Sequence, residues 1–221
     1  MSAFSEHALL ETGPIHGSIY AAKTHSVNFY AWKTGSGVVL FDTGFDRVAV
    51  RHALRVIGFE PSAVTHIFLT HSDIDHVGGL SLFPQAQVFL SADEEPMILH
   101  QQPRMGLVRN PRIRRPYQLL HDGDIVEADG ISIRAIAASG HTPGSMCYLA
   151  NGIALFSGDA FMLRKGETDT TPRYGMDIPR QRESIRRLAS LTGVELIFTG
   201  HWGMSQSFTD AFDKVQAQKV L

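Results

Sequence analysis

Four short polar clusters hold the side chains that could do chemistry in this sequence. They occupy residues 71–76 (HSDIDH), 139–144 (SGHTPG), 157–159 (SGD) and 199–201 (TGH), and each follows an apolar run. Short apolar runs favour buried strands, so we expect each cluster in a loop where a strand ends. Functional residues concentrate in such loops, and loops at one edge of a sheet can bring their side chains together.

The clusters contain side chains of two kinds that divalent transition metals bind, imidazole and carboxylate. The seven candidates are His71, Asp73, Asp75, His76, His141, Asp159 and His201. Seven ligands exceed the four positions around a tetrahedral ion and suit two ions that share a bridging ligand, a known hydrolytic arrangement. A solvated loop is the alternative for residues 71–76, but two histidines and two aspartates within six residues favour the metal site.

The segments between the clusters indicate strands and helices that alternate along the chain. Asp129-Gly130 and Asn151-Gly152 are typical of tight turns, so they predict hairpins over residues 124–136 and 146–156. Other strands are expected at residues 27–32, 38–41, 67–70, 88–90 and 195–198, and helices at 46–57, 180–192 and 207–220, the last capped by Ser207. This mixture predicts an α/β or α+β fold with two sheets.

Composition limits the classes of protein to which the chain can belong. The 221 residues are 43% hydrophobic and 19% charged, which predicts a packed core. This length suits one large domain or two small ones, and we expect a single domain over residues 1–221. A net charge of −2 gives no general attraction to nucleic acid or to an anionic membrane. Cys147 is the only cysteine, which excludes an intramolecular disulfide and a cysteine-rich zinc cluster. With no long apolar run and no secretion signal, a cytoplasmic protein is expected.

The clusters resemble, in order, the motifs of the metallo-β-lactamase-fold hydrolases. The matching segments are Asp42-Thr43-Gly44, Thr70 to His76, Gly140-His141-Thr142-Pro143-Gly144, Gly158-Asp159 and Gly200-His201. The resemblance runs from about residue 25 to residue 205. It implies a four-layer αββα sandwich with a metal site at one edge, between the two sheets.

The resemblance also implies a role for each candidate. His71 and His141 would bind a first metal, Asp75, His76 and His201 would bind a second, and Asp159 would bridge the two. Asp42 would hold the first loop in place. Two divalent ions, zinc above all, would share a water that loses a proton near neutral pH, and the resulting hydroxide would attack a carbonyl. Asp75 would act in catalysis by orienting this nucleophile and passing a proton onward.

Asp73 departs from the family pattern, because the family's usual residue there is a second histidine. As a ligand of the first metal, Asp73 would lower the net charge of the centre, and its oxygen would favour iron or manganese more than imidazole does. The alternative is that Asp73 points away and leaves the first site weak or empty.

Two irregular stretches are candidates for substrate binding. Residues 101–116 contain five arginines and no acid, and we expect a lid insertion at about residues 97–120. Arg112, Arg114 and Arg115 would then bind an anionic substrate. Tyr174, in the stretch 164–179, would form the opposite wall. A solvated surface loop or an oligomer contact is the alternative for the arginine segment.

These observations lead to a main hypothesis and three alternatives. The main hypothesis is a soluble binuclear metal hydrolase of a small ester, thioester or lactone, with a small-molecule substrate and no nucleic-acid or membrane partner. Lactonases of the family carry a tyrosine soon after the bridging aspartate. Ala160, Phe161 and Met162 follow Asp159 here, which weakens the case for a lactone substrate. The alternatives are a di-iron oxygen or redox protein, suggested by Asp73, a phosphodiesterase, and a non-catalytic binding module. The oligomeric state stays open.

Overall fold

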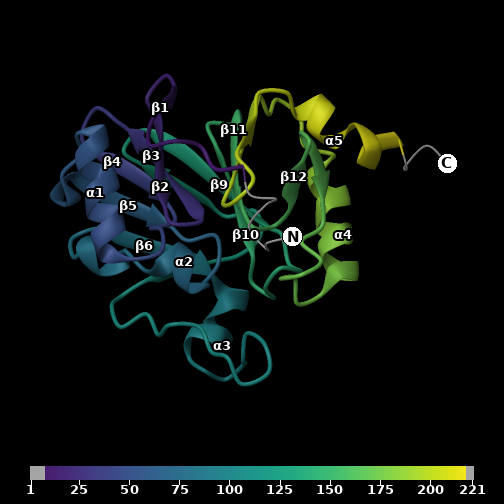
Figure 1. Ribbon diagram of the computed structural model, residues 1–221, viewed down its shortest axis with the longest axis horizontal. Coiled ribbons are helices and arrows are strands. Elements are labelled where there is room, and N and C mark those ends of the chain that lie inside the picture. Colours follow the sequence, from purple (N-terminus) through teal and green to yellow (C-terminus); the bar gives the residue numbers. More distant parts are fainter. Residues whose placement is uncertain (1–7, 218–221) are drawn as a thin grey trace.

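Two β-sheets face each other in the computed structural model, which describes residues 8–217, and helices cover the outer face of each sheet (Figure 1). The molecule is therefore a four-layer αββα sandwich, and the predicted fold class is confirmed.

Seven strands form the first sheet and follow one another across it in chain order. They are β1 (Gly13–His16), β2 (Ile19–Thr24), β3 (Val27–Lys33), β4 (Val38–Phe41), β5 (Val64–Phe68), β6 (Gln87–Ser91) and β7 (Gln118–Leu120). The strands from β1 to β4 pair antiparallel, and those from β4 to β7 pair parallel. Each parallel pair needs a crossover connection, which sends the chain over the outer face of the sheet.

The second sheet has six strands in the order β15-β14-β11-β10-β9-β8. They are β8 (Ile125–Ala128), β9 (Ile131–Ala137), β10 (Met146–Ala150), β11 (Ala154–Gly158), β14 (Leu196–Thr199) and β15 (Met204–Ser205). Only β11 and β14 pair parallel in this sheet. A separate two-stranded ribbon joins β12 (Met162–Arg164) to β13 (Glu167–Asp169).

The helices lie on both sides of the paired sheets. They are α1 (Arg47–Ile57), α2 (Ile74–Val77), α3 (Glu95–Ile98), α4 (Ile178–Leu188) and α5 (Phe208–Ala217), with short 3₁₀ turns at Pro61–Ala63, Leu80–Leu82 and Ala92–Glu94. Helix α1 begins where the Asp46 side chain accepts hydrogen bonds from the amides of Val48 and Ala49, and it ends at Gly58 with φ 77°. Its buried face packs on the first sheet, while α4 and α5 pack on the second.

The apolar layer between the sheets fixes how far apart they lie. It contains the rings of Phe41 at the end of β4 and Phe156 in β11, which stack with centroids 3.6 Å apart and planes 6° apart. Asp42 follows Phe41 directly, and Asp159 lies three residues after Phe156. Packing between the sheets therefore sets the separation of these two carboxylates.

The turn signals in the sequence predicted the hairpins correctly, while one strand, one helix and one irregular stretch differ from expectation. The strand expected at residues 67–70 is β5, which runs from Val64 to Phe68. Asp129 and Asn151 have φ 50°, as the two tight turns require. The helix expected at 180–192 runs from Ile178 to Leu188, because Asp177 caps it by accepting from the Arg180 amide. The stretch 164–179 is not wholly irregular, since it includes β13.

The last helix begins as predicted, since the Ser207 hydroxyl oxygen accepts from the Asp210 amide at 3.2 Å. Residues 218–220 of the predicted helix lie outside the described residues. Residues 99–117 contain no helix, and their only strand pairing is the isolated bridge between Met105 and Val108. Residues 118–120, at the end of the expected lid, form the edge strand β7 of the first sheet. No helix within residues 8–217 is long and apolar enough to cross a bilayer.

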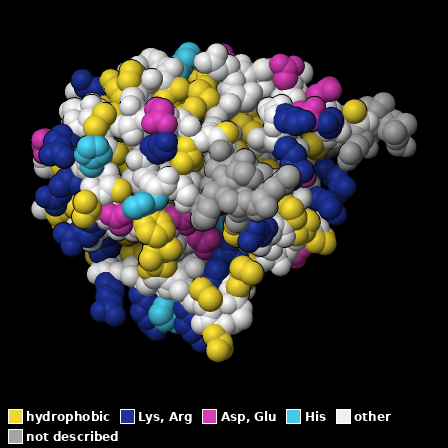
Figure 2. All heavy atoms as spheres, in the orientation of Figure 1, with side chains coloured by type: hydrophobic (Ala, Val, Ile, Leu, Met, Phe, Trp, Pro, Cys, Tyr) yellow, Lys and Arg dark blue, Asp and Glu magenta, His cyan; other side chains and the backbone are white. Residues whose placement is uncertain are grey.

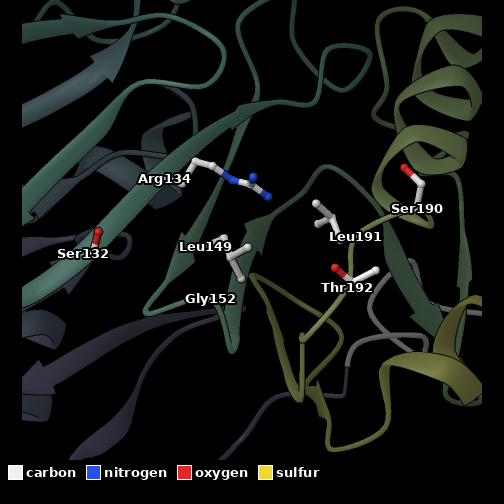
Figure 3. Close-up of a pocket in the computed structure, with 7 residues that line it drawn as sticks. All are labelled: Ser132, Arg134, Leu149, Gly152, Ser190, Leu191 and Thr192. Atoms are coloured by element: carbon white, nitrogen blue, oxygen red, sulfur yellow. The ribbon is translucent and has the colours of Figure 1, made fainter.

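Strands from both sheets end at the edge that carries the polar clusters. β5 precedes residues 71–76, β9 precedes 139–144, and β11 and β14 lead into Asp159 and His201. The turn at 151–153, between β10 and β11, lies at the opposite edge. There, a cavity of about 400 Å³ is lined by Gly152, Arg134 and the residues that follow α4 (Figure 3), and it includes none of the seven candidate ligands.

Candidate metal centre

The structure brings the seven candidate side chains together as two triads and one shared carboxylate. The first triad is His71, Asp73 and His141, and the second triad is Asp75, His76 and His201. Within each triad the potential ligand atoms lie within 4.8 Å of one another. Asp159 lies between the triads, with Oδ2 at 3.6 Å from His141 Nε2 and 3.1 Å from His201 Nε2.

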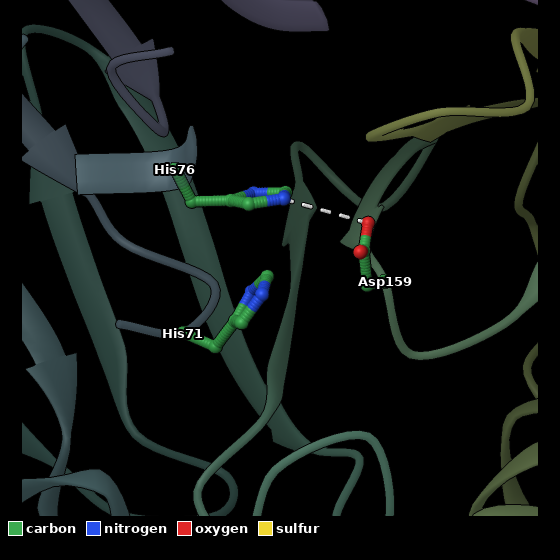
Figure 4. Close-up of side chains that lie close together, drawn as sticks. All are labelled: His71, His76 and Asp159. Carbon is green, nitrogen blue, oxygen red and sulfur yellow. Dashed lines mark ion pairs between the residues drawn. The ribbon is translucent and has the colours of Figure 1, made fainter. Parts of the chain in front are cut away.

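Figure 4 shows the middle of this arrangement. His71 and His76 come from the loop after β5 and from α2, and Asp159 comes from the end of β11 in the facing sheet. Both imidazoles extend toward Asp159, and its Oδ1 lies 3.5 Å from His76 Nε2. The same three residues form a further group of potential ligands, so the two triads are continuous through Asp159.

Each histidine turns one ring nitrogen away from the centre and the other toward it. The outer Nδ1 atoms lie next to Thr70 Oγ1 (3.1 Å from His71), Asp42 Oδ2 (2.7 Å from His76), Thr171 Oγ1 (3.3 Å from His141) and the Ser26 carbonyl (2.5 Å from His201). An acceptor at Nδ1 holds the proton there and leaves the Nε2 lone pair for a metal. The surroundings therefore orient four imidazoles for coordination.

Asp42 has the structural role expected from the sequence. One of its oxygens accepts from the Thr70 amide at 2.8 Å, and the other accepts from the Thr70 hydroxyl and from His76 Nδ1, at 2.8 and 2.7 Å. Asp42 thus ties the start of the loop after β5 to the histidine at its end. It has φ 62°, a left-handed conformation that aspartate tolerates better than most residues.

Burial and charge shift the pKa values of the centre in opposite directions. Burial alone would raise the pKa of Asp159, but His201 and His76 hold that pKa well below its usual range. Burial alone would lower the pKa values of these two histidines, yet Asp159 and the other carboxylates raise that of His201 to about 10 and that of His76 well above its usual value. In His141 burial prevails and lowers the pKa.

Buried atoms without partners show that the side chains suit a metal ion. His71 Nε2, His76 Nε2 and Asp159 Oδ1 are buried and have no hydrogen-bond partner within residues 8–217. An unsatisfied buried polar atom is costly, and a bound cation would satisfy all three. Imidazole nitrogens and carboxylate oxygens are ligands that zinc and its first-row neighbours accept.

Comparison with known proteins agrees with the fold. The family model for the metallo-beta-lactamase superfamily matches residues 22–201. The chain belongs to this superfamily. It is 31% identical to metallo-beta-lactamase domain-containing protein 1 of Xenopus laevis, over 90% of this chain and 80% of that protein. It is 25% identical to an N-acyl homoserine lactonase of Bacillus thuringiensis, over 84% of this chain and 87% of that protein.

Solved structures agree on the fold. A B3 metallo-beta-lactamase described as the first with an active-site glutamic acid aligns with a TM-score of 0.73 and 19% identity, over 99% of this chain and 91% of that chain. Members of the superfamily similar to this chain are metal-dependent hydrolases, and this chain is an enzyme of the same general kind.

Sequence reasoning did not identify two buried residues of the arginine segment that reach the centre. The Arg104 Nε donates to both oxygens of Asp73, at 2.8 and 3.0 Å, and its Nη2 donates to the Tyr174 carbonyl at 2.7 Å. The Asn110 amide donates to the hydroxyl of Ser72 and to Asp73 Oδ1, at 2.7 and 3.0 Å. These are the only buried residues among positions 101–110, a property that sequence pattern alone does not show.

Glu94 is a third residue that the sequence did not single out. This buried carboxylate accepts from the amide and hydroxyl of Ser72, at 2.9 and 2.6 Å, and from the Thr142 hydroxyl and the Gly144 amide, at 2.7 and 3.1 Å. It therefore joins the loop of the first sheet to that of the second. A carboxylate with four donors positions His71 and His141 through their neighbours.

Gly200 allows the last loop to approach the centre. A Cβ atom at this position would lie 2.5 Å from Asp159 Oδ1 and 2.8 Å from His76 Cε1, which real Cβ contacts essentially never reach. Glycine precedes His201 here because any side chain would displace Asp159 or His76.

The four predicted substrate-binding residues lie outside the centre. Arg115 donates to the main-chain carbonyls of Phe83, Pro84 and Ala86, and Arg112 Nε donates to His100. With Arg114, these arginines line a cavity of about 540 Å³ that also includes Ile74 and Val77 of α2. Tyr174 contributes its carbonyl to Arg104, while the residue is 38% exposed.

Proposed function

We propose that the chain hydrolyses a small ester, thioester or lactone with two divalent metal ions, zinc by preference. The observation that carries the proposal is the convergence of four oriented Nε2 atoms and three carboxylates at one edge of the sandwich. A donor set that mixes imidazole with carboxylate is typical of hydrolytic metal centres.

The first triad would hold one ion, the second triad would hold the other, and Asp159 would bridge them. When bound, the metals supply a Lewis acid that polarises a carbonyl and lowers the pKa of water. Asp159 supports the bridging role because its Oδ2 lies within 3.6 Å of a histidine nitrogen in each triad. Asp42 and the Ser26 carbonyl fix the proton positions on His76 and His201.

Asp75 is the residue that we assign to proton transfer. Its side chain is 23% exposed, more than that of Asp159 at 7%, so it lies toward the solvent side of the centre. Burial alone would raise its pKa, but His76 and His201 lower it below the usual value. The carboxylate is therefore ionised near neutral pH and available to orient an attacking water and accept its proton.

The substrate class rests on the relatives and on the surroundings of α2. The relative from Bacillus thuringiensis is named as a lactonase, which supports a cyclic or linear ester. The cavity beside α2 combines apolar side chains with Arg112 and Arg114, which suits a substrate with an anionic group. Tyr174 and Arg115 complete the proposed substrate contacts, although Arg115 already binds main-chain carbonyls.

Hydrolysis is favoured over the oxygen or redox chemistry that Asp73 suggested. The lactonase of Bacillus thuringiensis, which matches this chain over 84% of its length, supports hydrolysis. No separate feature of the described residues supports phosphodiester cleavage.

A substrate panel tests the proposal. Zinc-loaded protein would be assayed with lactones, aryl esters, acyl thioesters and a phosphodiester, alongside Asp75→Asn and the exposed control Asp169→Asn. We expect turnover of an acyl substrate that falls about a hundredfold or more in Asp75→Asn and stays near normal in the control. Turnover of the phosphodiester alone, or equal rates in both variants, would contradict the assignment.

A further inference from the structure

Arg104 reaches the first triad from the segment between α3 and β7. The residue is 7% exposed, and its guanidinium spans three partners on different loops. Nε binds both oxygens of Asp73, Nη2 binds the Tyr174 carbonyl, and Nη2 also lies 3.1 Å from His141 Nε2. A side chain so placed has little freedom to vary its position.

Two of the three potential ligands in the first triad are thus engaged by one cation. The Nε2 lone pair of His141 is the atom that coordination would use, and here it faces a guanidinium donor. Both carboxylate oxygens of Asp73 accept from the same group, and Asn110 adds a further donor to Oδ1. His71 Nε2, which lies 3.5 Å from Asp73 Oδ2, is the potential ligand atom of this triad without a hydrogen-bond partner in the described chain.

The second triad has different neighbours. No lysine or arginine within residues 8–217 is bonded to Asp75 or His76. Asp75 pairs with His201, and His76 pairs with Asp42 and Asp159. A divalent ion placed there would meet negative charge, whereas an ion in the first triad would meet the positive guanidinium at close range.

We propose that Arg104 competes with a metal ion for the first triad, so that the second triad fills first and the first triad fills only when the guanidinium withdraws. Arginine stays protonated at any physiological pH, so its positive charge repels a metal ion that approaches the first triad. The inference rests on the metal centre of the proposed function and adds an order of filling to it.

Zinc titration of wild type, Arg104→Ala and Arg104→Met tests this order. The methionine variant keeps much of the apolar stem and so protects folding. Calorimetry with a competing chelator, together with metal counts at fixed free zinc, should show one tight site and one site at least about tenfold weaker in wild type. Both variants should bind the second zinc about tenfold or more tightly than wild type does.

Arg109→Ala is the matched control, because Arg109 lies in the same segment, is exposed, and donates to the His100 carbonyl. It should bind zinc as wild type does. If both Arg104 variants bind the second zinc ion no more tightly than wild type does, the proposal is overturned. Weaker binding of that ion would mean that Arg104 supports the first triad. Absence of zinc binding in wild type and in every variant would instead reject the proposed function.

Wild-type protein provides a readout that needs no variant. The Nε–H signal of Arg104 in a nitrogen-15 NMR spectrum should stay in place with the first equivalent of zinc and move with the second. A signal that moves with the first equivalent, or that stays fixed after two, would contradict the competition.

Discussion

The two triads have the same number of potential ligands and share Asp159, yet their surroundings differ in charge. Around the second triad, Asp42 orients His76, and the Ser26 carbonyl orients His201. Around the first triad, a guanidinium lies against Asp73 and His141. The difference teaches that a ligand motif sets which atoms can coordinate, while their neighbours decide how readily they do so.

The largest expected effect comes from the residue that the triads share. Asp159→Ala should reduce bound zinc below two per chain and lower kcat by about a thousandfold, because neither triad is then joined to the other. Metal analysis and steady-state kinetics would be run beside Asp169→Ala, an exposed aspartate at the end of β13. If two zinc ions and the normal rate persist in Asp159→Ala, Asp159 is not the bridge.

A methyl group at Gly200 should damage the centre on the side of the second triad. In Gly200→Ala the new Cβ would meet Asp159 Oδ1 and His76 Cε1 at distances that force them apart. We expect zinc affinity of the second triad to fall about a hundredfold, with a smaller fall at the first. Gly13→Ala is the control, since a Cβ there meets nothing within 4 Å. Equal zinc binding in both variants would show that the loop shifts freely.

Removing the hydrogen-bond acceptor of His76 should lower the zinc affinity of the second triad more than that of the first. Asp42→Asn retains an oxygen for the Thr70 amide but loses the carboxylate oxygen that accepts from His76 Nδ1. Losing such an outer partner costs about 10- to 100-fold in metal affinity, and we expect that loss mainly at the second triad. Zinc titration would reveal it. A loss of zinc affinity confined to the first triad would contradict the role of Asp42 as the partner of His76.

The two triads should also differ in how their zinc affinity depends on pH. The raised pKa values of His76 and His201 mean that both carry protons near pH 7 when no metal is bound, so zinc must displace them. Affinity of the second triad should therefore rise about tenfold per pH unit for each proton released, between pH 6 and 8. The lowered pKa of His141 predicts a flatter dependence at the first triad.

Calorimetry in buffers with different ionisation heats would count the protons that zinc releases.

The same pKa shifts make the stability of the metal-free protein depend on pH. The contribution of His201 is present at low pH and is lost as the pH rises toward 10, whereas that of Asp159 is present at neutral pH and is lost on acidification. Zinc binding to the second triad without proton release would contradict the assigned charges.

Four of the seven candidate ligands could be grouped from the sequence because they lie within six residues of one another. Residues 71–76 form the loop after β5 and the start of α2, and the tight turns at Asp129 and Asn151 have dipeptide signals that depend on backbone geometry alone. Arg104, Asn110 and Glu94 gave no such signal. Their importance depends on which of several similar residues is buried, and that follows from packing between segments 20 or more residues apart.

The end of α4 could not be predicted from apolar spacing either. Leu191 continues the apolar spacing that predicted a helix to 192, but the helix ends at Leu188. The partly buried Leu191 still packs on the core of the second sheet, so burial and helical conformation do not coincide there.

Anomalous diffraction at the zinc edge, from crystals grown with one equivalent of zinc, tests the two-triad account most directly. We expect one strong peak about 2.0 to 2.2 Å from Nε2 of His76 and His201 and from an oxygen of Asp75 or Asp159, with Arg104 still bonded to Asp73. A peak within that distance of His71 and His141 instead, or no peak at this edge of the sandwich, would contradict it.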